Sequence, residues 1–416
     1  MLDVISLLLV LTAVFAYLNH RYIKLPTTIG VMVIALLLSI TLVGLEKLGL
    51  NGLREREEAF LRSIDFTQVM MQGMLSLLLF AGALHIKVNE LSAYKWQISV
   101  LAIFGTIASA LLVGFGTWYA LSLVGITLPL PYCLLFGAII SPTDPISVLG
   151  ILKSAKVPKS LEITIAGESL FNDGVGIVIF TLILEMVMMG NTPTIQDMVS
   201  LFIVEAVGGA VFGFVIGYIG YRMLKTIDNY QVEVLITLAT VMGGYSLANE
   251  LHISGPIAMV VVGLVIGNLG RTLAMSAKSR HHLDIFWELI DEILNAILFV
   301  LIGLEIVVTT FPEKSLSAAL MIIPVTLLAR FLSVGLPAAI WRDWFRLPPH
   351  SWAVLTCGGV RGGVSVALAL SLPRSTEHDI IVMLTYSVVI FSIFGQGLTV
   401  GPIAKRVGQR NAAKSK

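Results

Sequence analysis

The sequence is poor in charged residues and contains only two cysteines. Asp, Glu, Lys and Arg make up 13% of its 416 residues, against roughly 25% in an average soluble domain. Cys133 and Cys357 lie in long apolar stretches, and two such residues provide neither a disulfide framework nor the spacing of a metal site. No stretch between the apolar segments is long enough for a soluble domain. These absences argue against an ordinary soluble enzyme and against a secreted disulfide-rich scaffold.

Apolar residues, in contrast, make up 56% of the chain. A helix that crosses a bilayer core needs about 20 mostly apolar residues. The sequence therefore predicts an all-α polytopic membrane protein with about 13 transmembrane helices. The predicted helices span residues 2–19, 26–45, 66–86, 96–124, 130–152, 161–189, 198–224, 231–250, 255–271, 284–309, 315–341, 350–372 and 378–402.

The distribution of basic residues predicts the orientation of these helices. Arg21 and Lys24 follow the first apolar run, and no basic residue precedes it, a pattern typical of a membrane helix with its N-terminus outside rather than of a cleaved signal peptide. With alternating spans, the predicted inner side holds 19 of the 27 basic residues and the outer side holds six. The remaining two, Arg330 and Arg361, fall inside the membrane. This bias supports both the helix count and a cytoplasmic C-terminus.

Residues 1–416 are predicted to form a single transmembrane domain. Helices 1–6 and 8–13 are expected to be inverted repeats, an arrangement common in secondary transporters. The charged and amphipathic segment 46–65 is expected to lie at the outer membrane interface. Residues 403–416 are expected to be a short basic cytoplasmic tail.

Two of the predicted helices, the fifth and the twelfth, carry sequences that interrupt a helix. Ser141–Pro145 contains two prolines, which remove backbone donors, and Asp144 followed by Pro145 resembles the start of a new half-helix. Cys357–Gly363 places four glycines around Arg361 and is expected to be unwound. Because these helices are seven apart, they cross the membrane in opposite directions. Helix packing alone would explain one break, whereas two matched, charged breaks indicate a transporter's substrate site.

The sixth predicted helix contains two carboxylates in the octet Gly-Glu-Ser-Leu-Phe-Asn-Asp-Gly at 167–174. A charged side chain near the bilayer centre costs roughly 2.5–3.5 kcal/mol on insertion scales, so such residues pair, face water or handle ions. Ser169 and Asp173 are four apart and share a helix face, where their oxygens would suit a small monovalent cation. Glu168 lies on a different face, so the two carboxylates need not have the same role.

The other buried charges suggest pairing. Glu168 is placed to meet a cation from another helix, and Arg330 and Arg361 are the two candidates. Asp144 and Arg361 are expected to compensate the dipoles of broken helix ends. A ligand role for Asp144 remains open at this point.

The combination resembles the NhaP/NHE-type sodium–proton antiporters of the monovalent cation:proton antiporter superfamily. The matching pieces follow the family's order along essentially the whole chain: Ser141–Pro145, Gly167–Gly174, Arg330-Phe331 and Gly358–Gly363. The resemblance implies a secondary active transporter that works by alternating access and exchanges a monovalent cation, Na⁺ and also Li⁺, for H⁺. It further implies a homodimer in a prokaryotic inner membrane, without the large regulatory domain of animal exchangers. No cofactor, enzymatic activity or nucleic-acid partner is expected.

The resemblance also implies roles for individual residues. The family's cation site maps onto the side chains of Asp173 and Ser169 and the backbone oxygen of Thr143, with Asp144 close by. Its Asn-Asp pair maps onto Asn172 and Asp173, and an Asn at the first position implies electroneutral one-for-one exchange. Its buried ion pair maps onto Glu168 and Arg330. The cation and the proton are then expected to compete for Asp173. One departure is Ala81, where some relatives carry an acidic residue.

The sequence argues against two other functions and leaves two more open. An intramembrane hydrolase would need a motif such as His-Glu-x-x-His, which the sequence lacks. A channel would use buried charges but would not need paired helix breaks. A K⁺/H⁺ antiporter and an organic-anion carrier of the same architecture remain alternatives, although a titratable Asp173 beside a serine favours a cation.

Overall fold

Helices dominate the residues that the structure, a computed structural model, describes: 2–47, 73–144, 148, 152, 155, 157–189, 195–305 and 315–414. Within the described residues, each of the thirteen predicted spans contains a helix or an interrupted helix, which confirms the predicted all-α membrane fold. The elements are α1 (Leu2–Leu18), η1 (Asn19–Ile23), α2 (Thr27–Lys47), α4 (Leu75–Leu84), α5 (Val88–Ser92), α6 (Lys95–Ser99), η3 (Val100–Gly105), α7 (Thr106–Val124), α8 (Leu130–Ile140), α10 (Lys159–Met189), α11 (Ile195–Leu224), α12 (Tyr230–Glu250), α13 (Gly255–Val265), η4 (Ile266–Gly270), α14 (Arg271–Leu273), α15 (Ala277–Glu305), α16 (Ser315–Arg330), η5 (Phe331–Gly335), α17 (Leu336–Ile340), α18 (Ser351–Cys357), α19 (Gly363–Leu370), α20 (Thr376–Phe391), η6 (Ser392–Gln396) and α21 (Gly397–Lys414).

Seven helices of the described residues are long and apolar enough to cross a membrane on their own. They are Ser6–Ile23, Lys95–Val124, Lys159–Met188, Ser200–Leu224, Tyr230–Glu250, Ser317–Ile340 and Thr376–Gln396. Four further apolar helices are shorter: Thr27–Leu42, Leu75–Leu84, Leu130–Ile140 and Gly255–Gly270. The other two predicted spans correspond to α15, which carries acidic residues in its first half, and to the interrupted pair α18 and α19.

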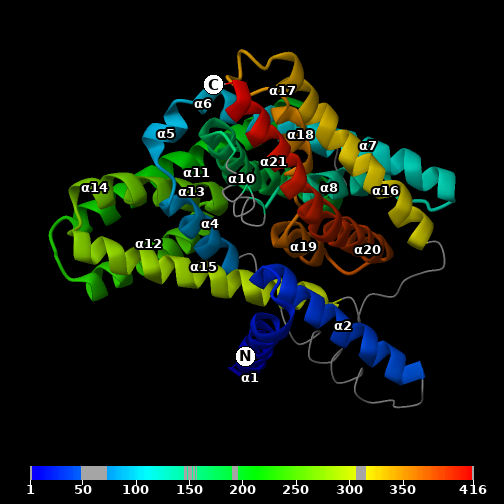
Figure 1. The fold of residues 1–416 in the computed structure, drawn as a ribbon, viewed down its shortest axis with the longest axis horizontal. Helices are drawn as coiled ribbons and strands as arrows, with labels where there is room; N and C mark the ends of the chain where they lie inside the picture. The colour runs from blue at the N-terminus through cyan, green and yellow to red at the C-terminus, as the bar shows by residue number, and fades with distance from the viewer. Residues whose placement is uncertain are drawn as a thin grey trace.

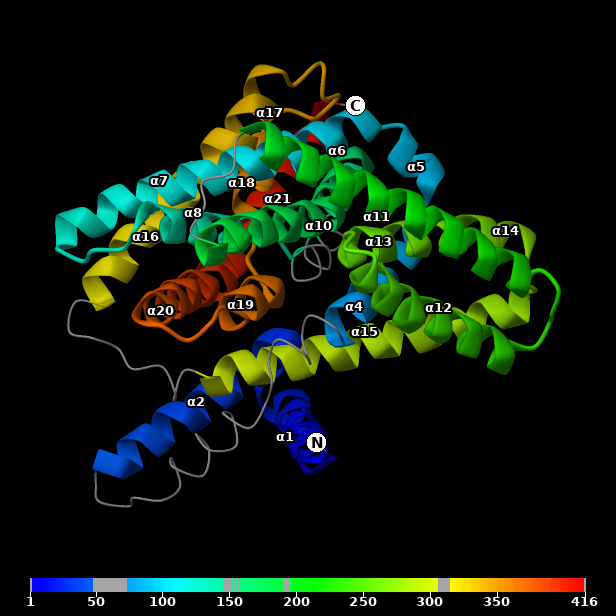
Figure 2. The same cartoon turned by 180° about the vertical axis from the view of Figure 1, so that it is seen from behind.

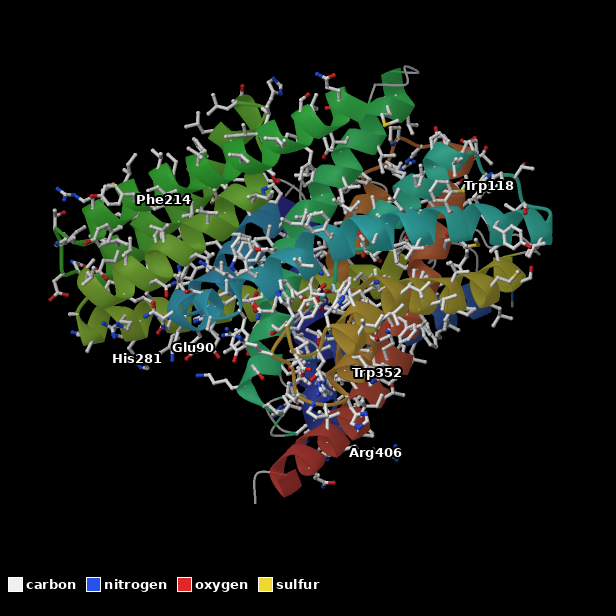
Figure 3. The ribbon with its side chains drawn as sticks, turned by 90° about the horizontal axis from the view of Figure 1, so that it is seen from above. Glu90, Trp118, Phe214, His281, Trp352 and Arg406 are labelled. Atoms are coloured by element: carbon white, nitrogen blue, oxygen red, sulfur yellow. The ribbon has the colours of Figure 1, made fainter. Side chains whose placement is uncertain are left out.

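The exterior of the molecule carries large apolar side chains, as expected of a protein surrounded by lipid. Trp118 of α7 is 50% exposed and Phe214 of α11 is 54% exposed (Figure 3). The orientation predicted from the basic residues stays a prediction.

The helices form two bundles on either side of a central boundary (Figures 1 and 2). The α13 bundle contains α1, α2, α4, α11, α12, α13 and α15, where α13 packs on α4, α11 and α12, and α15 packs on α2 and α4. The α8 bundle contains α7, α8, α10, α16, α18, α19 and α20, where α8 packs on α7, α10, α19 and α20. Along the boundary, α10 contacts α11 and α13, and α15 contacts α19.

Both predicted helix breaks are present in the α8 bundle. Helix α8 ends at Ile140, and residues 142–144 are not helical. Helix α18 ends at Cys357, and α19 begins at Gly363 after the non-helical residues 359–362. The half-helix predicted to start at Asp144-Pro145 falls on residues 145–147, which lie outside the described residues.

Two further predictions concern the C-terminal tail and the segment that was expected to lie at the membrane interface. The predicted basic tail 403–416 is helical as far as Lys414, because α21 continues without a break past Pro402. A proline at this point leaves the helix intact, since helices in membrane proteins tolerate proline where neighbouring groups compensate. Most of the predicted interfacial segment 46–65 lies outside the described residues, and the division into inverted repeats stays a prediction.

Candidate functional site

The two interrupted helices meet at their breaks. The backbone N–H of Asp144 donates a hydrogen bond of 2.8 Å to the carbonyl of Val360. A Cβ atom on Gly362 would lie 2.7 Å from the Cβ of Asp144, so only glycine allows the two chains to approach this closely. The break residues of α8 and of α18–α19 therefore support each other directly.

Arg361 lies at the same crossing. Its backbone N–H donates to the hydroxyl of Ser392 at 2.8 Å, and its guanidinium nitrogen Nη1 lies 3.5 Å from the carbonyl oxygen of Pro142. Arg361 is 3% exposed. A cation beside the carbonyl of Pro142, two residues past the end of α8, is placed to stabilise the negative end of that helix dipole.

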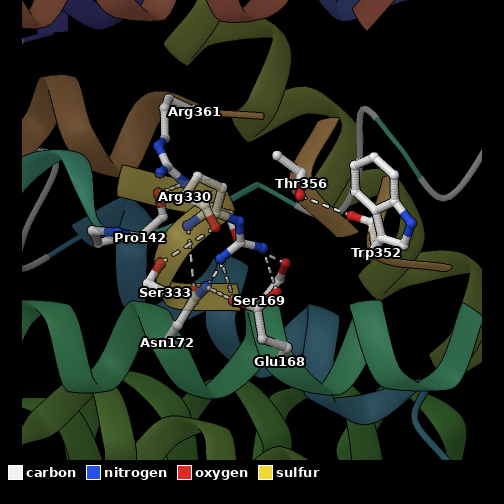
Figure 4. Close-up of polar contacts among 10 residues, drawn as sticks. Pro142, Glu168, Ser169, Asn172, Arg330, Ser333, Trp352, Thr356 and Arg361 are labelled. Atoms are coloured by element: carbon white, nitrogen blue, oxygen red, sulfur yellow. Dashed lines mark hydrogen bonds and ion pairs between the residues drawn. The ribbon is translucent and has the colours of Figure 1, made fainter. Parts of the chain in front are cut away.

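Glu168 and Arg330 form a buried ion pair (Figure 4). Nη1 and Nη2 of Arg330 donate to Oε1 and Oε2 of Glu168, each at 2.8 Å. The side chains are 0% and 5% exposed, respectively. This two-pronged geometry is the strongest form of an arginine–carboxylate contact. Of the two arginines proposed as partners of Glu168, the structure places Arg330 in contact with it.

A hydrogen-bond network links this ion pair to the break in α8. Nδ2 of Asn172 donates to Oε1 of Glu168 at 2.9 Å and to the hydroxyl of Thr143 at 2.8 Å. The backbone N–H of Thr143 donates to Oδ1 of Asn172 at 3.3 Å, and the Thr143 and Ser169 hydroxyls are 2.9 Å apart. Asn172 thus braces the non-helical segment against α10, and this contact uses both ends of its amide.

Asp173 lines a cavity of about 90 Å³ at the boundary between the two bundles. A volume of roughly 10–15 Å³ holds one water molecule, so the cavity has room for a small cation with some of its water. The carboxylate residue itself is 8% exposed. The lining residues are Leu75, Leu78, Leu79, Gly82, Pro142, Thr143, Asp144, Leu170, Asp173, Asn295, Leu298, Gly362, Gly363, Val364 and Ser365.

The structure thus separates the predicted site residues into two neighbouring groups. Asp173, Thr143 and Asp144 line the cavity, whereas Ser169 and Asn172 turn toward Thr143. Thr143 belongs to both groups and connects them. On α4, Gly82 is one of the residues that line the cavity. Its neighbour Ala81, which replaces the acidic residue of some relatives, is buried and is not among the lining residues.

Two polar residues of the cavity were not predicted from the sequence. Asn295 of α15 and Ser365 of α19 both line it. A lone asparagine in the apolar run Ile293–Leu304 is a signal that could have indicated Asn295. No comparable signal marks Ser365, which is one of several serines in membrane helices.

Two π-helical turns also support the site. Arg330 directly precedes the turn η5, and Ser392, which accepts the Arg361 N–H, begins the turn η6. Such turns widen a helix locally and occur often at functional sites. Periodicity in the sequence does not reveal them.

A buried carboxylate in a small cavity, placed where two interrupted helices cross between two bundles, is the arrangement of a secondary transporter. The family model described as "Sodium/hydrogen exchanger, transmembrane" matches residues 9–406. The chain therefore belongs to the sodium/hydrogen exchanger family, as its motifs predicted.

Individual relatives agree with this assignment. The Na(+)/H(+) antiporter NhaP of Pseudomonas aeruginosa is 50% identical over 412 residues, which cover 98% of this chain and 97% of that protein. The Na(+)/H(+) antiporter NhaH of Halobacillus dabanensis is 33% identical, with 97% of each chain covered. Among solved structures, the sodium proton antiporter MjNhaP1 from Methanocaldococcus jannaschii at pH 8 has the same fold, with a TM-score of 0.74, 20% identity and 97% of each chain covered.

Proposed function

We propose that this protein exchanges Na⁺ for H⁺ across the membrane and that Asp173 carries both ions in turn. The observation that carries the proposal is the different environment of the two carboxylates on α10. Glu168 is held by both terminal nitrogens of Arg330, whereas Asp173 faces the cavity. One carboxylate therefore has a structural partner, and the other is placed to bind a cation or a proton.

The cavity also favours a small cation over an organic anion. About 90 Å³ is far below the roughly 300–1,000 Å³ of pockets for drug-sized molecules. Its two acidic side chains, Asp173 and Asp144, would repel an anion. Oxygen ligands of this kind suit hard cations. Thr143 and Ser169 complete the proposed Na⁺ site, and Asn172 holds Thr143 in place.

Transport in vesicles tests the proposal. The purified protein is reconstituted into proteoliposomes that contain a pH-sensitive dye, a pH gradient is imposed, and Na⁺, Li⁺ or K⁺ is added separately. We expect Na⁺ and Li⁺ to dissipate the gradient. A response to K⁺ alone would replace the proposal with K⁺/H⁺ exchange, and no response to any of the three cations would contradict cation–proton exchange altogether.

The exchange is expected to be electroneutral. One carboxylate that trades one proton for one monovalent cation moves no net charge, and Asn172 beside Asp173 cannot titrate. Moving one charge across 100 mV is worth about 2.3 kcal/mol, so an electrogenic cycle would respond visibly to voltage. The Na⁺-driven rate in vesicles should stay unchanged when valinomycin and a K⁺ gradient impose a potential. A rate that follows the potential would indicate that Asp144 also carries protons.

Alternating access would follow from movement of the two bundles against each other. The cavity lies on their boundary, with α4 and α15 on one side and α8, α10 and α19 on the other. A displacement along this boundary would open the cavity toward one side of the membrane at a time. We place the protein in a bacterial plasma membrane as a homodimer, with the N-terminus outside, which cysteine labelling and cross-linking in intact cells would test.

A further inference from the structure

Ser365 has an unusual environment for a serine in a membrane helix. It is 1% exposed, its hydroxyl oxygen has no hydrogen-bond partner, and it lines the cavity that holds Asp173. Serine and threonine in helices ordinarily donate to a backbone carbonyl three or four residues earlier. Thr356 does so to Trp352 and Ser371 to Leu368, on the same interrupted helix.

The helix break explains why Ser365 lacks this bond. Ser365 is the third residue of α19, so the carbonyls three and four residues earlier belong to Arg361 and Gly362, which are not helical. Buried hydroxyls nearly always have a partner. Because Ser365 also lines the cavity, a ligand bound there could supply the missing partner.

Asn295 is a second polar residue that lines the same cavity. Its Nδ2 donates to the backbone carbonyl of Asp291 at 2.9 Å and to the Asp291 carboxylate at 3.2 Å. Rotating the amide by 180° would place its oxygen against these two acceptors, so the orientation is fixed by repulsion. The amide oxygen is then the end of the side chain directed away from Asp291, and the residue lines the cavity.

We propose that Ser365 and Asn295 are further ligands of the transported cation, and that Asp291 positions Asn295. The inference rests on the proposed function, because it assigns additional oxygens to the same site. Thr143 and Asp144 come from the broken fifth helix and Asp173 from α10, whereas these two ligands come from α19 and α15. Ser169 is bonded to Thr143, so the oxygens of Ser365 and Asn295 add ligands that the sequence motifs do not supply.

The test compares Ser365→Ala with a matched control. Ser109 on α7 is likewise 1% exposed with an unpartnered hydroxyl, but it does not belong to the cavity lining. We expect Ser365→Ala to raise the KM for Na⁺ in proteoliposomes about fivefold or more, with the maximal rate largely retained. Ser365→Thr, which keeps the hydroxyl, should stay near the wild-type KM, and Ser109→Ala should leave KM unchanged.

Binding without transport gives an independent measurement. In detergent, Na⁺ should raise the melting temperature of the wild type, and Ser365→Ala should shift the midpoint of that Na⁺ titration by the same factor as KM. Asn295→Ala should shift both measurements in the same direction, and it carries the test if Ser365→Ala does not reach the membrane. An unchanged KM and an unchanged Na⁺ titration in these variants would overturn the inference. A wild-type protein without Na⁺-driven proton movement would instead overturn the proposed function.

Discussion

Asp173→Asn is expected to abolish cation-dependent proton movement in proteoliposomes while the protein still folds. Asparagine keeps the size of the side chain but cannot bind a proton or neutralise a cation, so neither half of the exchange remains. The residue lines the cavity and is not part of the buried ion pair of α10, so its loss should leave the packing intact. Dye-reported proton flux after addition of Na⁺ measures the activity, and a monodisperse elution profile with a melting transition measures folding.

Glu185→Gln is a suitable control for this experiment. Glu185 lies on the same helix, α10, and does not line the cavity. The substitution therefore removes one carboxylate from α10 and leaves the cavity unchanged. We expect it to exchange at close to the wild-type rate. Sustained Na⁺/H⁺ exchange by Asp173→Asn would refute the central role of Asp173 and direct attention to Asp144.

The second large effect is expected on stability. Glu168→Gln leaves the charge of Arg330 buried without its counterion, and breaking a buried pair in this way costs about 3–5 kcal/mol. The pair is fully enclosed, with side chains 0% and 5% exposed. The melting temperature in detergent should therefore fall much further for Glu168→Gln than for Asp173→Asn.

A double-mutant cycle separates the pair from its surroundings. If the two side chains stabilise each other, Arg330→Gln combined with Glu168→Gln should destabilise the protein by much less than the sum of the single changes. Additive effects would show that the contact contributes nothing and would make Arg361 the next candidate partner. Arg361→Gln combined with Glu168→Gln provides the matched comparison, because Arg361 contacts Ser392 and Pro142 instead.

The spans and both breaks were predictable because each depends on local composition. A bilayer requires a minimum apolar length, and two prolines within four residues or four glycines within six favour an interruption of a helix. The pairing of Glu168 required a partner from far along the chain, and the sequence alone left Arg330 and Arg361 both possible. The resemblance to a family selected Arg330, and the structure places these two side chains in contact.

The cavity walls were harder to predict because they depend on how distant helices pack. Ser365 and Asn295 both lie more than 120 residues from Asp173 along the chain, and Asn295 belongs to the opposite bundle. Nothing in the local sequence marks the atoms that face inward. The π-helical turns were missed for a similar reason, since no residue type marks the extra residue of such a turn.

The cavity is built from two walls that differ in how freely they can change. On one wall, the N–H of Asp144 is bound to Val360 and the side chain of Thr143 is bound to Asn172, so a substitution there disturbs several bonds at once. On the opposite wall, α4 contributes only the side chains of Leu75, Leu78 and Leu79 and the surface of Gly82. A single substitution on α4 would therefore change the shape of the cavity without breaking any of the hydrogen bonds that hold the crossed breaks together.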